Sequence, residues 1–465
     1  MRIPAYSAYK DSDTDFLGSV PAHWKLERLK HCAEVFPSNV DKKTVDGQVP
    51  VKLCNYTDVY YNDIIEAGLD FMSATATEDQ AKRFELQQDD VVFTKDSESA
   101  DDIGIAALVS KRLPGVIYGY HLSIARANGS AVGAFLRRYF ESQETKSYFA
   151  ISANGLTRVG LGQYAVDNAP IALPTVEEQT KIARFLDHET AKIDALIQEQ
   201  ERLIELLQEK RQAVISHAVT KGLDPDVPMK DSGVEWLGEV PAHWEVTRLK
   251  FVSTIIDCKN RTPEYFDDGD YLVVRTSNVR DQSLRREGAY YTDEQNYRIW
   301  TQRGVPPVGS ILFTREAPAG EVCIVPEGVP LCLGQRMMNF IPDDPRHTRF
   351  IFDFLTSDCL VRYMESVAHG STVSHLRVEQ VYDIPLVIPP IEEQEAIDQK
   401  VSIIKTRFKS LIEESKITIE LLVERRSALI SAAVTGKIDV RAWQPPADES
   451  AFDEEVRQAG LEEAV

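Results

Sequence analysis

Apolar positions in residues 174–222 follow the spacing of a long helix with a single apolar side. Glutamate, glutamine and lysine fill most of the positions between them. The apolar residues that we assign to the contact side are Ile193, Leu196, Ile197, Ile204, Leu207 and Val214. Because such a helix gains stability from its apolar side only against another surface, the segment predicts a partner helix.

The partner is predicted in residues 389–438, where the same pattern returns 215 residues later. Both segments begin with proline followed by two glutamates, which suit the positive end of a helix dipole. We expect an antiparallel coiled coil, with Gln200 and Arg211 fixing its register. The alternative is a pair of unrelated surface helices of a globular enzyme. The matching contact residues are Phe408, Leu411, Ile412, Ile419, Leu422 and Leu429.

The repeat extends beyond the helices. Residues 10–30 and 230–250 share a Lys-Asp-Ser start, a Leu-Gly pair, a Pro-Ala-His-Trp box and a closing Arg-Leu-Lys. In each half, the segment after the box contains short β-rich runs and one longer helical pattern. The clearest strand and helix patterns are those of residues 89–96, 309–316, 133–152 and 349–368. The frame is thus repeated, while most residues between the landmarks differ.

These patterns predict an α+β (mixed α/β) protein in which two pseudo-two-fold-related domains are separated by two long antiparallel helices that form a coiled coil. The repeat is too long, and occurs too few times, for a solenoid. The expected parts are a first mixed domain (1–173), a helix (174–222), a second mixed domain (223–388), a second helix (389–438) and an acidic tail (439–465).

Composition narrows the class of protein. With 465 residues, 43% of them hydrophobic and 27% charged, the chain fits a soluble protein of two or three domains. We expect it in the cytoplasm without a membrane partner, because it has neither a membrane-length apolar run nor a signal-peptide pattern. The six cysteines lack paired spacing and are expected to be reduced. The net charge of −21, part of it in the tail, opposes DNA binding by the chain alone.

Motifs of catalysis and metal binding are missing from the sequence. The chain has no phosphate-binding loop, adenosylmethionine loop, hydrolase motif or clustered His/Cys set. His23 and His243 lie in the repeated box, where a structural role is favoured over acid–base chemistry. We therefore expect binding rather than catalysis, with no catalytic residue and no metal.

Basic and amide side chains of the two mixed segments are the candidates for contact with double-stranded DNA. Arginine can read guanine, asparagine or glutamine can read adenine, and glycine loops suit phosphate oxygens. The alternatives are a salt-bridged surface and glycines that merely end helices. The candidates in the first segment are Lys95, Arg126, Asn154, Gly155, Thr157 and Arg158. Those in the second are Arg261, Arg275, Asn278, Arg315, Gln335, Arg336, Gly370, Ser371, Thr372 and Arg377.

The combination of these motifs resembles the DNA-specificity (S) subunit of type I restriction-modification systems. The resemblance rests on Trp-Leu-Gly-x-x-Pro-x-His-Trp at residues 236–244, on the proline and Glu-Glu-Gln before each long helix, and on the duplication. It covers residues 10–439. The first copy of the box departs from the pattern, with Asp15-Phe16 in place of Glu235-Trp236, but keeps an aromatic residue.

The resemblance implies two target recognition domains, each reading one half of a bipartite, asymmetric DNA site, with the helices as spacers that set the gap. It implies a non-catalytic subunit that holds no cofactor. Its partners would be two modification subunits, which use S-adenosylmethionine to methylate adenine, and restriction subunits, which use ATP and Mg²⁺.

Two other classes of protein remain as alternatives. The chain could be the recognition part of a single-chain restriction-methylation enzyme, although the nuclease and adenosylmethionine motifs are missing. It could also be a helical protein–protein adaptor without DNA contact. The adaptor hypothesis predicts that replacing Arg315 and Arg336 has no effect on DNA recognition.

Overall fold

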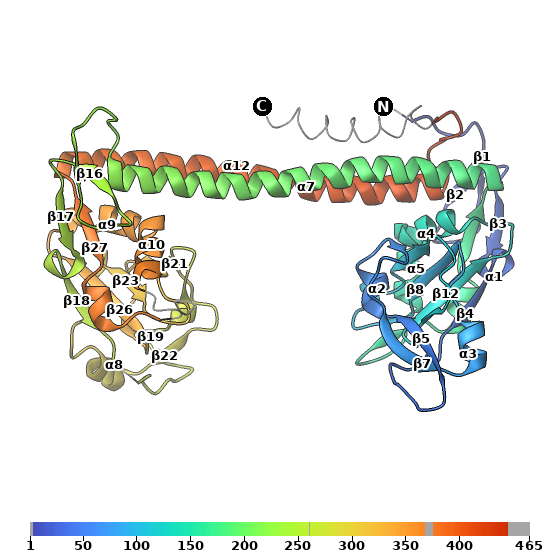
Figure 1. The fold of residues 1–465 in the computed structure, drawn as a ribbon, viewed down its shortest axis with the longest axis horizontal. Helices are drawn as coiled ribbons and strands as arrows, with labels where there is room; N and C mark the ends of the chain where they lie inside the picture. Colours follow the sequence, from blue (N-terminus) through green and yellow to red (C-terminus); the bar gives the residue numbers. More distant parts are fainter. Residues whose placement is uncertain (1–2, 260, 368–374, 445–465) are drawn as a thin grey trace. The chain divides into compact units, whose positions relative to one another are not determined.

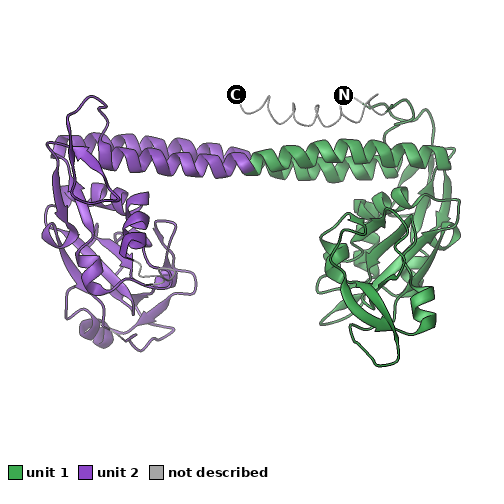
Figure 2. Cartoon of the chain, in the orientation of Figure 1, with its two compact units in different colours: residues 1–201, 416–465 green, residues 202–415 purple. Residues whose placement is uncertain are grey.

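The computed structural model describes residues 3–259, 261–367 and 375–444. The chain forms two compact units, one made of residues 1–201 and 416–465 and the other of residues 202–415 (Figure 2). We call them unit 1 and unit 2 and describe each by itself. In the described part of the chain, no helix is long and apolar enough to cross a membrane.

Two long helices run through both units (Figure 1). They are α7 (Val176–Lys221) and α12 (Ile391–Val434). In unit 1, Ile182 of α7 and Val434 of α12 belong to one apolar core, and in unit 2 Val219 of α7 and Ile397 of α12 do. The start of each helix thus packs with the end of the other, which confirms the predicted antiparallel pair. The division of the chain at residues 173, 222, 388 and 438 stays a prediction.

Unit 1 contains two sheets that pack face to face. The larger sheet has the order β4 (Ala33–Pro37), β12 (Leu122–Ala127), β8 (Asp90–Thr94), β10 (Ala106–Val109), β6 (Ile64–Ile65). The smaller sheet has the order β11 (Val116–Tyr118), β5 (Val49–Cys54), β7 (Met72–Ala76). Val92 of β8 faces the smaller sheet, while Val91 and Phe93 face the other way, because successive side chains of a strand alternate.

Two short helices cover the other face of the larger sheet in unit 1. They are α4 (Gly133–Glu141) and α5 (Gln143–Ser152). Phe135 of α4 and Phe149 of α5 share one apolar core with Phe93 of the sheet and Leu186 of α7. The short helices therefore connect the sheet to the long helices.

The single helical pattern predicted for residues 133–152 is two helices in the structure. The break falls at Ser142, whose backbone is extended and whose hydroxyl accepts the N–H of Thr145. A serine in this position is a favourable N-cap, so α5 begins anew there. Hydrophobic spacing alone does not show the break, because both helices bury the same side.

Unit 2 repeats the arrangement of unit 1. Its larger sheet has the order β18 (Ser253–Asp257), β26 (Met337–Pro342), β23 (Ile311–Thr314), β24 (Val322–Ile324). Its smaller sheet has the order β22 (Tyr290–Thr292), β19 (Tyr271–Val274), β25 (Leu331–Leu333). The covering helices are α9 (Thr348–Leu355) and α10 (Asp358–Val367). In both units the smaller sheet combines one parallel and one antiparallel pairing, so the smaller sheets of two unlike segments share one topology.

Two-stranded ladders hold the ends of each domain together. In unit 1 they pair β1 (Tyr9–Asp11) with β2 (Ser19–Pro21), β3 (Lys25–Arg28) with β14 (Pro170–Leu173), and β9 (Asp96–Ser97) with β13 (Val159–Gly160). In unit 2 they pair β15 (Met229–Asp231) with β16 (Glu239–Pro241), and β17 (Glu245–Arg248) with β27 (Pro385–Ile388). The β3–β14 and β17–β27 ladders bring the strand after each box next to the strand that leads into a long helix.

The repeated Pro-Ala-His-Trp box binds the first turn of a long helix in each unit. In unit 1 the indole of Trp24 donates to Glu178 Oε1 at 3.2 Å, and His23 Nε2 lies 3.0 Å from the other carboxylate oxygen. In unit 2 the equivalent tryptophan and histidine contact Glu393 at 2.8 and 2.6 Å. The box and the Glu-Glu-Gln sequence recur together because they bind each other.

Candidate nucleic-acid interface

The central strand of each unit ends in the same backbone frame. In unit 1 the N–H of Lys95 donates to the carbonyl of His121 at 3.0 Å, and in unit 2 the N–H of Arg315 donates to the carbonyl of Arg336 at 2.9 Å. The carbonyls of Lys95 and Arg315 each accept an N–H from the segment that follows the glycine loop, at 2.8 and 2.9 Å. Lys95 is therefore equivalent to Arg315, and His121 to Arg336.

A carboxylate organises the basic side chains at this place in unit 1. Asp96 Oδ1 lies 2.7 Å from His121 Nδ1 and 3.1 Å from Arg158 Nε. The ammonium of Lys95 donates to the carbonyl of Ser38 at 3.4 Å, and burial lowers the pKa of this lysine. We call Lys95, Asp96, His121 and Arg158 the Asp96 cluster. Its carboxylate fixes an imidazole and a guanidinium together at the end of β8.

Unit 2 has a different set of groups on the equivalent frame. Glu316 Oε2 lies 3.1 Å from Arg336 Nε, and Glu316 Oε1 lies 3.5 Å from Arg315 Nη2. The side chain of Arg336 is 46% exposed, whereas that of Arg315 is 13% exposed. We call these three residues the Glu316 cluster. It presents two guanidiniums, of which Arg336 is the more accessible.

Tyrosines line the surface beside the Asp96 cluster. The rings of Tyr56 and Tyr60, on α2 (Tyr56–Tyr60), are stacked with centroids 5.5 Å apart, and Tyr61 contacts Tyr60 edge-on. The Tyr60 hydroxyl donates to Asp102 at 3.0 Å, and this hydrogen bond raises the pKa of the phenol. Burial raises the pKa of Tyr56, and the charges of Asp96 and Arg158 also affect this pKa. Tyr56 therefore adjoins the charged cluster, and Tyr56 and Tyr60 stay protonated at neutral pH.

In unit 2 a second pair of stacked rings lies beside Arg275. The guanidinium of Arg275 lies 3.5 Å above the ring of Tyr290, which stacks on Tyr265 with centroids 4.3 Å apart. Arg275 also donates to the carbonyl of Gly288 at 2.9 Å. Stacking on an aromatic ring fixes the plane of a guanidinium.

The structure brings most of the predicted residues of unit 1 together. Lys95 and Arg158 belong to the Asp96 cluster, and Asn154, Gly155 and Thr157 lie in the loop that leads to Arg158. Gly155 has φ +145°, and a Cβ atom there would lie 2.0 Å from the carbonyl oxygen of Arg158, so only glycine fits.

Arg126 lies apart from the other candidates of unit 1. It pairs with Asp90 across the β12–β8 ladder, at the opposite end of β8 from Lys95. Its guanidinium donates to both Asp90 oxygens, at 2.7 and 2.6 Å, and to the carbonyl of Glu85. These hydrogen bonds tie Arg126 to its own unit.

The predicted residues of unit 2 fall into separate groups. Arg315 and Arg336 belong to the Glu316 cluster, and Gln335, which precedes Arg336, is exposed. Arg275 is adjacent to buried Asn278, whose amide accepts the N–H of Arg275 and donates to the carbonyl of Arg285.

The remaining candidates of unit 2 lie outside these groups. Arg261 accepts the indole N–H of Trp300 through its carbonyl. Arg377 precedes α11 (Val378–Tyr382), and its N–H donates to Gln380. Gly370, Ser371 and Thr372 lie outside the described residues.

The predicted helix-contact residues differ in exposure. Ile193 and Ile412 are buried, and Leu411 is 36% exposed. Partial burial is expected for two helices that cover each other on one side only. The residues with intermediate exposure are Leu196, Ile197, Ile204, Leu207, Val214, Phe408, Ile419, Leu422 and Leu429.

The sequence prediction missed the carboxylates that organise both clusters. Asp96 and Glu316 directly follow the shared Phe-Thr-Lys and Phe-Thr-Arg landmarks, so an acidic residue recurs at the same place in both halves. His121 and Arg336 likewise each follow a landmark glycine by two residues. The recurrence of these residues at equivalent positions of the two halves could have identified them from sequence.

The cysteines of the chain are free and buried. Burial raises the pKa of Cys32, Cys323 and Cys332 to about 12, which disfavours the thiolate form that binds metals. Within the described ranges, no group of three or more His, Cys, Asp or Glu residues could hold a metal ion.

Comparison with known proteins gives a double match. The family model of the type I restriction modification DNA specificity domain matches residues 24–206 and 241–421. The putative type I restriction enzyme MjaX specificity subunit of Methanocaldococcus jannaschii is 23% identical over 434 residues, covering 91% of this chain and 96% of the relative. The MjaVIII specificity subunit of the same organism is 23% identical over 431 residues, covering 91% and 94%.

Solved structures share the fold. The HsdS subunit from Thermoanaerobacter tengcongensis has a TM-score of 0.52 and 17% identity, over 90% of this chain and 98% of that one. A chain from work on complex assembly and conformational transition of the type I R-M system has a TM-score of 0.62 and 19% identity, over 89% and 98%. The shared fold and the two matches to the domain model define the class of protein, a specificity subunit with two similar domains. The chain belongs to the type I restriction modification DNA specificity family.

Proposed function

We propose that each unit reads one half of a bipartite, asymmetric DNA site for a type I restriction-modification complex. The observation that carries this proposal is one backbone frame with two different sets of side chains. Unit 1 presents the Asp96 cluster and unit 2 presents the Glu316 cluster at equivalent strand ends. Different groups on the same frame suit two different half-sites.

The chemistry of the clusters suits base edges and phosphates. Glu316 binds the Nε of Arg336, an arrangement that leaves the far end of a half-exposed guanidinium for the two acceptors of guanine. In unit 1, His121 and Arg158 are oriented by Asp96, and the adjacent glycine loop offers backbone N–H groups for phosphate oxygens. The tyrosines of α2 add flat surfaces against sugars or unstacked bases.

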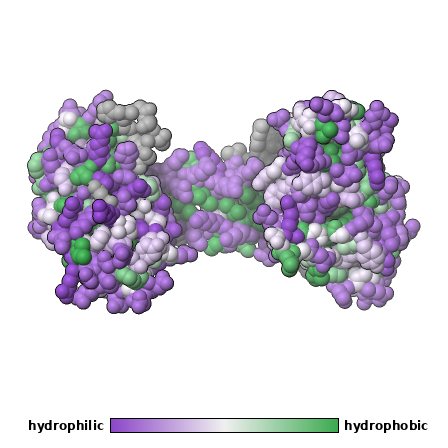
Figure 3. Space-filling model, turned by 90° about the horizontal axis from the view of Figure 1, so that it is seen from below, coloured by the Kyte–Doolittle hydropathy of each residue, from purple (hydrophilic) through white to green (hydrophobic). Residues whose placement is uncertain are grey.

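The long helices supply surfaces for partner subunits. Apolar side chains that are 45 to 64% exposed lie along them, and Figure 3 shows apolar surface on the helices. Exposed apolar patches of this kind mark protein interfaces. In this proposal two modification subunits carrying S-adenosylmethionine dock there, and restriction subunits using ATP and Mg²⁺ join them in the cytoplasm. The chain itself is non-catalytic and binds no cofactor. These apolar side chains are Val176, Leu206, Ile403, Ile417, Leu421 and Val423.

Mapping of methyladenine tests this function. The chain is co-expressed with its modification subunit in a host free of other methylation, and a bipartite motif is expected. Arg336→Ala is expected to weaken recognition of one half-site by about 1 to 3 kcal/mol for each base that the arginine reads, without changing the other half. Arg346→Ala is the control, because that exposed arginine pairs with Asp344 and belongs to neither cluster.

The same experiment separates the alternatives. A helical adaptor predicts an unchanged motif for both arginine variants. A single-chain enzyme predicts methylation by this chain without any modification subunit. An unchanged motif for the Arg336 variant would remove the Glu316 cluster from the reading surface.

A further inference from the structure

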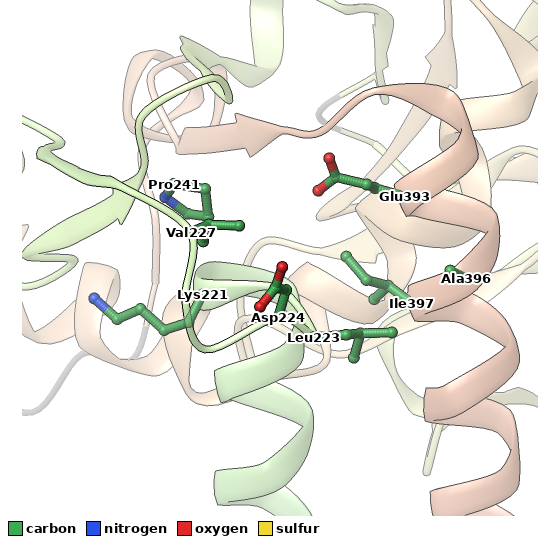
Figure 4. A pocket seen from close by; sticks show the side chains of 9 residues that line it. Lys221, Leu223, Asp224, Val227, Pro241, Glu393, Ala396 and Ile397 are labelled. Atoms are coloured by element: carbon green, nitrogen blue, oxygen red, sulfur yellow. The ribbon is translucent and has the colours of Figure 1, made fainter.

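A pocket of about 230 Å³ lies beside the start of α12 in unit 2 (Figure 4). Leu223, Val227, Pro241 and Ile397 form its apolar walls, and Asp224 and Glu393 supply two carboxylates. We call these six residues the α12 socket. Figure 4 shows Leu223 beside Ile397, with Val227 and Pro241 across the space.

The equivalent place in unit 1 is filled by the chain itself. Glu178 corresponds to Glu393, because each begins a long helix and accepts from the tryptophan of its box. In unit 1 the hydroxyl of Tyr6 also donates to Glu178, at 2.6 Å, and the guanidinium of Arg441 lies 4.9 Å from the Tyr6 ring centroid. As a result the side chain of Glu178 is 5% exposed, whereas that of Glu393 is 42% exposed.

In unit 1 the segment that follows α12 also covers the start of α7. Trp443 packs edge-on against Phe185 of α7 with ring centroids 5.7 Å apart, and Val440 is buried in the same apolar core. The carbonyl of Arg441 accepts from the ammonium of Lys181 on α7 at 3.0 Å. An aromatic ring, an arginine and an apolar residue thus cover the start of α7.

The charges around the two places differ. Asp439 in unit 1 and Asp224 in unit 2 each accept the N–H of the residue two positions later, at 3.0 Å. In unit 1 that residue is Arg441, whose guanidinium binds Asp439 at 2.9 and 2.7 Å. In unit 2 it is Asp226, which brings no guanidinium to Asp224. The basic residue among those that line the pocket is Lys221, whose ammonium donates to the carbonyl of Glu239, so the α12 socket combines apolar walls with the carboxylates of Asp224 and Glu393.

We propose that the α12 socket binds a segment of a partner protein in which an aromatic side chain lies next to an arginine or lysine. Such a segment would supply the apolar ring, the hydrogen-bond donor and the positive charge that Tyr6, Arg441 and Trp443 supply in unit 1. The proposal goes beyond DNA reading and does not rest on it, since no residue of the socket belongs to the Glu316 cluster.

Charge argues against the chain's own last residues as the occupant. Residues 445–465 contain seven acidic residues and only one basic residue, Arg457. Repulsion from Asp224, Asp226 and Glu393 disfavours such a segment in the socket. The acidic residues are Asp448, Glu449, Asp453, Glu454, Glu455, Glu462 and Glu463.

The first test uses a peptide copied from the segment that fills unit 1. The peptide Gly-Lys-Ile-Asp-Val-Arg-Ala-Trp-Gln, residues 436–444, is titrated into the full chain by calorimetry. One binding site is expected, and peptides with Arg441→Glu or Trp443→Ala are expected to bind at least about tenfold more weakly. Absence of binding, or tighter binding of an acidic peptide of residues 446–458, would overturn the proposal.

A matched pair of variants tests whether the peptide binds in the α12 socket. Leu223→Asp puts a third carboxylate on the apolar wall and is expected to weaken binding at least about tenfold. Val308→Asp is the control, because Val308 is a similarly exposed apolar residue of unit 2 outside the socket (58% against 46%). Thermal unfolding of both variants checks that they fold. Equal affinity of wild type and the Leu223 variant would refute the assignment.

A cross-linking experiment then tests the site in the assembled complex. All six native cysteines are buried, so Leu223→Cys can be labelled selectively with a photoreactive maleimide. In the purified complex with the modification subunit, the adduct is expected at a partner segment with an aromatic residue beside a basic one. Adducts confined to residues of this chain would contradict the proposal, whether or not the complex reads DNA.

Discussion

At the scale of single residues, the second glutamate of each long helix has a role beyond the helix dipole. Glu178 accepts hydrogen bonds from Tyr6 and Trp24 and is buried. Burial and the hydrogen bond to Glu178 raise the pKa of the Tyr6 phenol well above its usual value, so Tyr6 remains a donor. This carboxylate therefore joins three segments that are distant in sequence.

Replacing these glutamates should reveal the difference between the two units. Glu178→Ala leaves the hydroxyl of Tyr6 and the indole N–H of Trp24 without their acceptor, and we expect a loss of about 2 to 4 kcal/mol in the free energy of unfolding. Glu393→Ala leaves fewer buried donors without an acceptor, so we expect a smaller loss of about 1 kcal/mol in the free energy of unfolding. Urea unfolding followed by tryptophan fluorescence measures both losses. A larger loss for Glu393→Ala would contradict this view.

The glycine loop of unit 1 gives a second prediction at this scale. Gly155→Ala places a Cβ atom against the carbonyl of Arg158, and we expect a cost of about 1 to 3 kcal/mol and weaker methylation through one half-site. Gly162→Ala is the control, because its φ is −68° and nothing lies within 4 Å of the added atom. Thermal unfolding and methyladenine mapping measure the two effects, and similar behaviour of both variants would refute the prediction.

At the scale of elements, the sequence predicted the central strands and the long helices better than the short helices. The runs at 89–96 and 309–316 contain β8 and β23, because buried strands are short apolar runs bounded by polar residues. The two pairs of short helices were each predicted as one, since a serine N-cap is a local hydrogen bond that periodicity does not record.

The length of the helix pair should set the gap between half-sites. We expect that adding seven residues after Glu201 in α7 and seven after Ser415 in α12 lengthens each helix by about 10 Å, the rise of about three base pairs. The methylated motif should gain unread base pairs, or activity should be lost, while the bases read on either side stay the same. A motif with an unchanged gap and altered half-sites would count against the spacer role.

At the scale of the whole molecule, charge limits what the chain can do alone. With a net charge of −21, it lacks the excess of positive charge that most DNA-binding proteins use to neutralise phosphates. The arginines of both clusters are also paired with carboxylates. We therefore infer that partner subunits contribute much of the DNA affinity.

A gel-shift comparison checks this inference. The chain alone should bind its DNA weakly and lose binding between about 50 and 200 mM salt, whereas the complex with modification subunits should bind tightly and specifically. A tight, sequence-specific shift by the lone chain would disprove it. A chain ending at Gln444 removes a net charge of −6 (seven acidic residues and one arginine) and should bind somewhat better than the full chain.

The candidate site was only partly accessible from sequence. Lys95, Arg158, Arg315 and Arg336 were selected by residue type, and the structure pairs the three arginines with carboxylates and the lysine with the carbonyl of Ser38. Arg126 had the same chemistry but lies across a ladder from Asp90, a pairing set by strand order. Residue type gives chemical capacity, whereas the partner depends on the path of the chain.

By itself, the sequence determined the duplication, the helix pair, the mixed α/β class and the family resemblance, because periodicity and repeated motifs are local properties of the chain. Which carboxylate binds which basic side chain, and the contact between Trp24 and Glu178, follow only from the folded chain, since most of these contacts join residues far apart in sequence. The tertiary structure also showed that the start of α7 is covered while the equivalent place at α12 is a pocket. Two nearly identical motifs differ there because residues 4–6 meet residues 439–443 in unit 1, whereas the segment between α7 and β15 crosses the same place in unit 2.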